Sequence, residues 1–326
     1  GSGQMVRFYT RHEDKFQVWT LEEMLGRGEL KHVLWVDMLK PKKEEIDKVE
    51  AMFGVDVPDK FEREEIELSS RYWEDNDTIT ISSYFFISFF FVATAKGHYN
   101  ESVGFVIKEN TLFSIRESEL RTFDTVHKMV AQNQKELVSG YDIFMQIFDI
   151  RIDQDADLLE YASRESDEIR KKLLLESDVK STETLKKIAT LQEFTLKIRQ
   201  GVFDKRRILT AMAKSSKPPQ SIKEDLFIMM RDINSLVEFI AMNDSTLENL
   251  QNLFLAQTSI EQNKIIKLFT VANVVLMPPT LIASIYGMNF HFMPELGWTL
   301  GYPFSLGAMI LSGVIPLIYF KNRGWL

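Results

Sequence analysis

Polar side chains recur at regular intervals in a long apolar segment of the last quarter of the sequence. Between Leu268 and Pro294 there is no Lys, Arg, Asp or Glu, yet amide and hydroxyl side chains are spaced 7, 3, 7 and 4 residues apart. These spacings place them on one helical face. Amides are costly in hydrocarbon, so this face is expected to contact protein or water. It carries Asn263, Thr270, Asn273, Thr280 and Ser284, and Ile266 and Met277 fall on the same stripe.

Two interpretations of this polar stripe remain open on the residues alone. Ser, Thr and Asn side chains commonly hydrogen-bond across helix–helix interfaces, so the stripe is compatible with simple packing. The alternative is a water-filled path lined by one such helix from each of several subunits. Because two helices cannot enclose a water-filled path, this second interpretation requires oligomerisation.

The segments that carry the stripe and follow it have the length of membrane helices. The stretch between Leu268 and Pro294 and that between Leu296 and Phe320 lack Lys, Arg, Asp and Glu. Each holds about 20 mostly apolar residues, roughly enough to cross a hydrocarbon core. A buried hairpin of a large soluble domain is the alternative. The excess of basic residues at the flanks predicts cytoplasmic termini and an external loop at about 289–301. The flanking bases are Lys264, Lys267, Lys321 and Arg323.

The charge is divided unevenly along the 326 residues. The whole chain has 39 basic and 47 acidic residues, a net charge of −8, but the part from Lys264 onward has four bases and one acid. The part before it therefore has 35 and 46, a net charge of −11. An acidic balance argues against a nucleic-acid partner. Because there is no Cys, disulfides, thiolate zinc sites and cysteine catalysis are excluded.

Residues 5–130 are expected to form an α/β cytoplasmic domain, and residues 1–4 are expected to be a remnant of cloning. Short runs rich in β-branched and aromatic residues predict the strands. The run YFFISFFFV predicts a central buried strand, closed by a turn at Gly97. One charged helix is predicted to begin at Pro41, and a second is predicted to cover Asp59–Leu68. The predicted strands are Val6–Tyr9, Phe16–Trp19, Val33–Val36, Thr78–Ala95, Ser102–Lys108 and Thr111–Ile115.

Residues 131–263 are expected to form long cytoplasmic helices, and residues 264–326 a transmembrane hairpin. Breaks are predicted near Ser177–Ser181 and Ser215–Gln220. From there to about Met288 the sequence is compatible with one helix of roughly 100 Å, a stalk continuous with the first membrane helix. Asp142–Asp178 contains eleven acids and five bases. That segment is either a solvated helix face or a surface that concentrates cations.

The segment after the striped helix carries a specific motif. It reads YGMNFHFMPELGW from Tyr286 to Trp298, followed by GYP. The combination of Tyr-Gly-Met-Asn with Met-Pro-Glu-Leu resembles the signature of the CorA family of magnesium channels. The similarity extends to EQNKIIKLF before the span, PPT within it and YFKNRGWL after it. It covers the last 65 or so residues closely, and Met230–Asp232 supplies a further MRD match.

The resemblance implies an α+β membrane protein of the cell (inner) membrane that assembles as a homopentamer, with Mg²⁺ as transported and regulatory ion and no organic cofactor. The selectivity element would be Gly287-Met288-Asn289, whose amides would hydrogen-bond the waters of hydrated Mg²⁺. The pore-lining residues would be those of the polar stripe. Of these, Ile266 and Met277 would form apolar constrictions. Membrane lipid and divalent cations are the expected partners.

The loop and the regulatory residues match the family less closely. His291 occupies a loop position where family members often have an acid, which leaves Glu295 as the only acid in the loop. Asp232 is the stalk candidate for sensing cytoplasmic Mg²⁺, with Glu64 or Glu65 of a neighbouring subunit opposite it. Ordinary surface acids are the alternative for both glutamates. The four flanking bases form either a basic collar at the inner mouth or anchors for lipid headgroups.

Other classes of function are weighed against the channel. An enzyme is disfavoured, because the five histidines show no metal-ligand spacing and there is no phosphate-binding glycine loop. A transporter of Zn²⁺, Co²⁺ or Ni²⁺ from the related ZntB group is one alternative. A membrane-tethered sensor that does not conduct is another.

Overall fold

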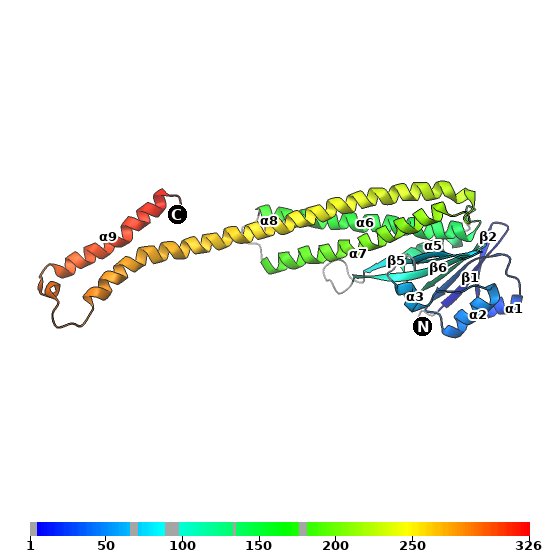
Figure 1. Cartoon of the computed structure of the whole chain (residues 1–326), viewed down its shortest axis with the longest axis horizontal. Coiled ribbons are helices and arrows are strands. Elements are labelled where there is room, and N and C mark those ends of the chain that lie inside the picture. Colours follow the sequence, from blue (N-terminus) through cyan, green and yellow to red (C-terminus); the bar gives the residue numbers. More distant parts are fainter. Residues whose placement is uncertain (1–4, 66–70, 89–97, 133–134, 176–180) are drawn as a thin grey trace. The chain divides into compact units, whose positions relative to one another are not determined.

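The computed structural model describes residues 5–65, 71–88, 98–132, 135–175 and 181–326, shown along the chain in Figure 1. The chain divides into two compact units, one ending at Gln251 and one beginning at Asn252. The domain boundaries expected from the sequence, at 130/131 and 263/264, remain predictions. Residues 1–4, which are expected to be a remnant of cloning, lie outside the described residues.

A seven-stranded sheet forms the centre of the first unit, in the order β2-β1-β3-β7-β6-β5-β4. The neighbours β3 and β7 are parallel, and all other neighbouring pairs are antiparallel. The strands are β1 (Met5–His12), β2 (Lys15–Thr20), β3 (Val33–Leu39), β4 (Tyr72–Glu74), β5 (Thr78–Ser88), β6 (His98–Lys108) and β7 (Thr111–Arg116).

Short helices cover one face of the sheet, and their ends follow from local chemistry. Thr20 caps α1 (Leu21–Arg27) by accepting from the Glu23 amide, and Asp59 caps α3 (Lys60–Glu64) in the same way. Gly28 ends α1 and Gly54 ends α2 (Lys43–Phe53), both with positive φ. On this face the core includes Met24, Val36, Met38, Val49 and Phe113.

The other face of the sheet packs against longer helices through aromatic rings. Because strand side chains alternate, Trp35 points away from the Val36 side and contacts Phe123 of α5 (Arg121–Ala131). Phe105 of β6 lies edge-on to Phe144 and Phe148 of α6 (Gly140–Leu175). The sheet thus has helices on both faces, as the α/β prediction requires (Figure 1).

Two more helices complete the first unit. The helix α7 (Ser181–Lys214) packs on α6 and on β5. Lys223 Nζ, in the first turn of α8 (Gln220–Tyr286), donates to the carbonyls of Met212, Ala213 and Ser215. These bonds satisfy the end of α7 and fix the turn into α8.

Most predicted elements are present, with shifted ends. The break at Ser215–Gln220 is confirmed, and the long helix ends at Tyr286. The helix predicted over Asp59–Leu68 is shorter, because α3 ends at Glu64 and Glu65 is already extended. The end of the strand predicted to Ala95, the Gly97 turn and most of the break near Ser177–Ser181 lie outside the described residues.

The second unit contains the end of α8, the short 3-10 helix η2 (Pro294–Gly297) and α9 (Gly301–Asn322). Two helices of the described chain are long and apolar enough to cross a membrane, namely α8 and α9. Their apolar windows are almost entirely uncovered within this chain, with 6% of residues buried in each. A core hairpin of a soluble domain would bury these residues, so this alternative is disfavoured.

Candidate functional site

The residues of the polar stripe share one face of α8. Four of them, Asn273, Met277, Thr280 and Ser284, line a single shallow concavity of about 560 Å³. The apolar members of the stripe are uncovered as well: Ile266 is 61% and Met277 66% exposed. Asn263 is exposed and Thr270 partly buried. The helix therefore presents the stripe as one continuous surface.

Helix α9 packs on a different face of α8. A Cβ placed on Gly313 of α9 would lie 3.3 Å from the Val275 carbonyl oxygen and 3.7 Å from Pro279 Cγ. Val271, one turn before Val275, is buried. At 3.6 residues per turn, Val271, Val275 and Pro279 lie roughly half a turn from the stripe. The partner helix of the same chain thus leaves the stripe open.

The paired prolines of α8 explain part of this packing. Pro278 and Pro279 have no amide hydrogen, so the carbonyls of Val274 and Val275 lose their usual helical partners. The close approach of Gly313 brings backbone against the freed Val275 carbonyl. The meeting of one of these carbonyls with a glycine of the second helix was not predicted from the sequence.

The Gly287-Met288-Asn289 segment follows directly on α8. The Gly287 amide donates to the Ala283 carbonyl at 2.9 Å and the Met288 amide to Ile285 at 3.3 Å, which continue the last helical turn. Asn289 is exposed, and no side-chain hydrogen bond of Asn289 is found within the described ranges. Its carboxamide is thus available to a ligand. His291 and Glu295, in the loop that follows, are both exposed.

The basic residues that flank the two helices meet through the C-terminal tail. Lys267 Nζ lies 5.5 Å from the centre of the Trp325 ring, and Trp325 stacks on Phe320 with 5.2 Å between ring centres. Arg323 lies over Tyr319 at 5.5 Å. The start of the first apolar segment and the end of the second thus lie together at the end of the hairpin opposite the loop, where Lys264 and Lys321 are exposed too.

Asp232 belongs to an acidic group that the sequence only partly identified. Burial, followed by the charges of Asp153, Asp232 and Asp225, raises the pKa of Asp149. Burial and then Asp232 and Asp157 raise the pKa of Asp153. Acids of α6 and α8 therefore face each other. The spacing of Asp149, Asp153 and Asp157 by four residues was the signal that could have found them.

The other two regulatory candidates, Glu64 and Glu65, lie at the end of α3. Glu64 is exposed and ends α3, and Glu65 is partly buried, with its carbonyl accepting from Arg71 Nη1 at 3.4 Å. In the part of the chain that the structure describes, no group of three or more His, Asp or Glu side chains is arranged to hold a metal ion. A metal at Asp232 would therefore need the acids to move or a neighbouring subunit to contribute.

Comparisons with known proteins cover nearly the full chain. The family model of CorA-like Mg²⁺ transporter proteins matches residues 31–322. The magnesium transport protein CorA of Wolinella succinogenes is 44% identical over 322 residues, which cover 99% of this chain and 100% of that protein. The magnesium transport protein CorA of Campylobacter jejuni is 43% identical over 302 residues, covering 90% and 92%.

Solved structures share the fold at low sequence identity. The complete CorA magnesium transporter from Methanocaldococcus jannaschii has a TM-score of 0.80 at 20% identity and covers 100% of both chains. The full-length CmaX protein has a TM-score of 0.71 at 11% identity and covers 100% of this chain and 99% of its own. With a matching family model over most of its length and close relatives over nearly all of it, the chain belongs to the CorA-like Mg²⁺ transporter family.

Proposed function

We propose that this CorA-family membrane protein is a homopentameric channel for Mg²⁺ influx, with α8 of each subunit lining the pore. The observation that carries the proposal is the stripe on α8, which is polar and is left open by α9 on another face. In a membrane such a face needs water or protein against it. A closed ring of identical helices supplies both, with water at its centre.

The outer end of the pore would select the ion through Asn289. Mg²⁺ releases its waters reluctantly, so a ring of carboxamide oxygens that accept hydrogen bonds from those waters recognises the hydrated ion. A carboxylate ring would hold the ion more tightly and slow its release, whereas conduction requires both entry and exit. The free carboxamide of Asn289 suits this role, and Gly287 and Met288 would hold it at the helix end.

The apolar residues of the stripe would close the pore. Ile266 and Met277 lie on the stripe and expose 61% and 66% of their surface, so in a ring they would narrow the path with apolar groups. Such constrictions stop ions by excluding water. The proposed direction is inward: two charges crossing an inside-negative potential of about 100 mV gain roughly 4.6 kcal/mol.

The proposed location is the inner membrane, with both termini cytoplasmic. One end of the hairpin is marked by Lys267, beside the Trp325 ring, and by Arg323, over the Tyr319 ring. The loop with His291 and Glu295 marks the other end. By the positive-inside tendency, the basic end faces the cytoplasm. There the four flanking bases would form the collar, in contact with lipid headgroups.

Cytoplasmic Mg²⁺ would regulate the channel through the acids around Asp232. Burial and, after it, repulsion among the acids raise the pKa values of Asp149 and Asp153, and a divalent cation would relieve the repulsion. Glu64 or Glu65 of a neighbouring subunit would complete the site and tie the ring together at high Mg²⁺. Loss of Mg²⁺ would loosen the ring and open the pore.

The first prediction concerns ion selection. Purified protein in liposomes with an inside-negative potential should take up Mg²⁺, read by an indicator dye inside, and the detergent particle should weigh about 190 kDa, five times 37.9 kDa. Asn289→Ala should reduce uptake to the level of protein-free liposomes, because the water-binding ring is lost. Asn322→Ala, an exposed amide at the end of α9, serves as the matched control and should conduct normally.

Contradicting results for this prediction are specific. Normal uptake by Asn289→Ala would remove Asn289 from the filter. Absence of uptake by the wild type would favour a sensor that does not conduct. Uptake of Zn²⁺ in preference to Mg²⁺ would favour the alternative transporter.

The second prediction concerns regulation. Asp232→Asn combined with Asp153→Asn should raise the Mg²⁺ concentration that half-inhibits uptake by about tenfold, since charged ligands of the cation are lost. Glu248→Gln, an exposed acid on the same helix, should leave inhibition unchanged. Equal inhibition in the double variant and the control would exclude Asp232 and Asp153 as the main sensor.

A further inference from the structure

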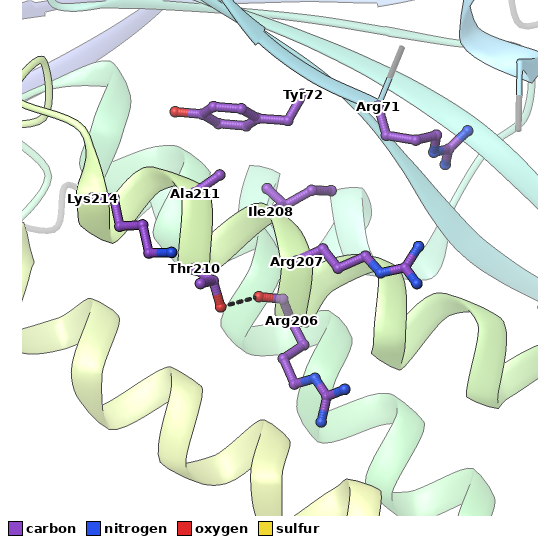
Figure 2. Close-up of a pocket in the computed structure, with 8 residues that line it drawn as sticks. All are labelled: Arg71, Tyr72, Arg206, Arg207, Ile208, Thr210, Ala211 and Lys214. Atoms are coloured by element: carbon purple, nitrogen blue, oxygen red, sulfur yellow. Dashed lines mark hydrogen bonds between the residues drawn. The ribbon is translucent and has the colours of Figure 1, made fainter. Parts of the chain in front are cut away.

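A cavity of about 690 Å³ lies in the first unit, between the sheet edge at β4 and the last turns of α7. Arg206, Thr210 and Lys214 follow one another at intervals of four residues and therefore share a face of α7. Figure 2 shows their side chains along the helix, with Arg71 and Tyr72 opposite, at the start of β4. None of these residues belongs to the stripe, the loop or the acidic group of Asp232.

The cavity is strongly basic in an acidic chain. Arg71, Arg206, Arg207 and Lys214 all line it, and no acid does among the residues that the structure describes, although the chain carries a net charge of −8. Among the residues that the structure describes, none of the three bases on α7 forms a salt bridge. The Arg206 guanidinium lies 5.0 Å from the centre of the Phe203 ring, and no described acid neutralises it or the charges of Arg207 and Lys214.

Arg71 is a donor held in position. Its side chain is 3% exposed, Nε donates to Asp204 at 3.1 Å, and Nη1 donates to the Arg63 carbonyl at 3.0 Å. Asp204 is itself held by Ser83 Oγ at 2.8 Å. The buried Nη2 has no partner within the described ranges. A buried donor without a partner is costly, so a ligand oxygen there would relieve that cost.

The neutral polar groups of the cavity are already engaged. The Tyr72 hydroxyl donates to Glu74 Oε1 at 2.6 Å, and Thr210 Oγ1 donates to the Arg206 carbonyl at 2.7 Å. Glu74 is also bound by Lys217 Nζ at 3.2 Å. The donors left for a ligand are therefore cationic, which favours an anion. The Tyr72 ring and the Ile208 side chain add an apolar wall suited to a planar group.

We propose that this cavity binds a nucleoside polyphosphate. Its phosphates would lie against Arg206, Arg207, Lys214 and Arg71 Nη2, and its base against the ring of Tyr72. Guanidinium groups match phosphate oxygens in pairs, and the cavity volume falls within the usual range for small-molecule sites. The proposal is independent of the channel mechanism, because it is tested by binding and not by flux.

The experiment is calorimetric titration of ATP into the full-length protein in detergent, in buffer without Mg²⁺. ATP should bind, pyrophosphate should bind more weakly, and higher salt should weaken both. Arg206→Gln with Arg207→Gln should lower the ATP affinity by about tenfold or more. Lys186→Gln with Lys187→Gln, two exposed bases of the same helix, should bind ATP as the wild type does.

The variant Tyr72→Leu distinguishes the contribution of the base to binding from that of the phosphates. It should weaken ATP binding and leave pyrophosphate binding unchanged. The proposal is overturned if ATP does not bind, or if the Arg206/Arg207 variant binds it as the wild type does. It is also overturned if that variant changes the mass of the particle, which would make the cavity a contact between copies of the chain. Binding of phosphatidic acid vesicles without binding of ATP would likewise contradict it and indicate a lipid headgroup.

Discussion

At the scale of single residues, Asp37 shows how the sheet holds charge in its interior. Arg116 Nη2 donates to Asp37 Oδ2 at 2.8 Å, Ser114 Oγ donates to Oδ1 at 2.8 Å, and His127 Nε2 lies 2.9 Å from Oδ2. Burial opposes ionisation of Asp37, but Arg116 and His127 outweigh it and hold its pKa below the usual 3.8. The carboxylate therefore joins β3, β7 and α5.

The third prediction follows from this network. Asp37→Asn should destabilise the protein by about 3–5 kcal/mol, because Arg116 is left buried without its counter-charge. Thermal unfolding followed by tryptophan fluorescence measures the change. Asp77→Asn, on a carboxylate that is 59% exposed and 3.6 Å from Lys108, is the matched control and should shift stability by less than about 0.5 kcal/mol.

The pH dependence of this difference has a definite sign. Since the pKa of Asp37 is lower in the folded than in the unfolded chain, its contribution is fully present above pH 3.8 and declines as the pH falls below that value. The gap between wild type and Asp37→Asn should therefore be constant near neutrality and narrow in acid. A gap that widens in acid, or equal stability at pH 7, would contradict the account.

The sequence predicted which functional side chains lie together only where all of them belong to one helix, because their spacing then places them on one face. The stripe from Asn263 to Ser284 lies on a single helix, so its periodicity alone placed it on one face. The group around Asp232 was only partly identified, since its other members are on α6. The Asp37 network was not identified, because the parallel pairing of β3 with β7 brings Asp37 opposite Ser114 across a long stretch of sequence.

At the scale of elements, α8 has two distinct faces in its apolar part, one that contacts α9 and one that carries the polar stripe. Val275 and Pro279 lie against Gly313 of α9, Val271 is buried on the same face, and the opposite face carries the stripe. Gly313 favours this close approach, because a Cβ at that position would lie only 3.3 Å from the Val275 carbonyl oxygen. The helices themselves were predictable from their apolar length, but their contact faces were not, since α9 is apolar all round.

The fourth prediction tests that contact. Gly313→Ala should be less stable than Gly307→Ala, because its methyl group would lie 3.3 Å from the Val275 carbonyl oxygen and the two helices would have to move apart by a few tenths of an ångström. Gly307→Ala, on the same helix, places a Cβ where no atom lies within 4 Å. It should be neutral or slightly stabilising. Thermal unfolding in the same detergent compares the two, and equal stability of both variants would show that α9 does not pack at Gly313.

At the scale of the whole molecule, the net charge of −8 averages two unlike parts. The acidic part contains the sheet, the helices α6 and α7 and the acids around Asp232, whereas the part from Lys264 onward is apolar with basic flanks. Family membership and two helices able to span a membrane make this a membrane protein. A hairpin that leaves a polar stripe open is incomplete as a single copy, and the proposed pentameric pore would cover the stripe.

The most direct test of the pore is the accessibility of the stripe to water. The chain has no cysteine, so a single introduced thiol is the only target of a water-soluble methanethiosulfonate reagent. Thr280→Cys, on the stripe, should react in proteoliposomes, and the reaction should block Mg²⁺ uptake. Val275→Cys, on the face toward Gly313, should remain unreacted with uptake intact. An unreactive Thr280→Cys, or one whose modification leaves uptake unchanged, would contradict a pore lined by α8.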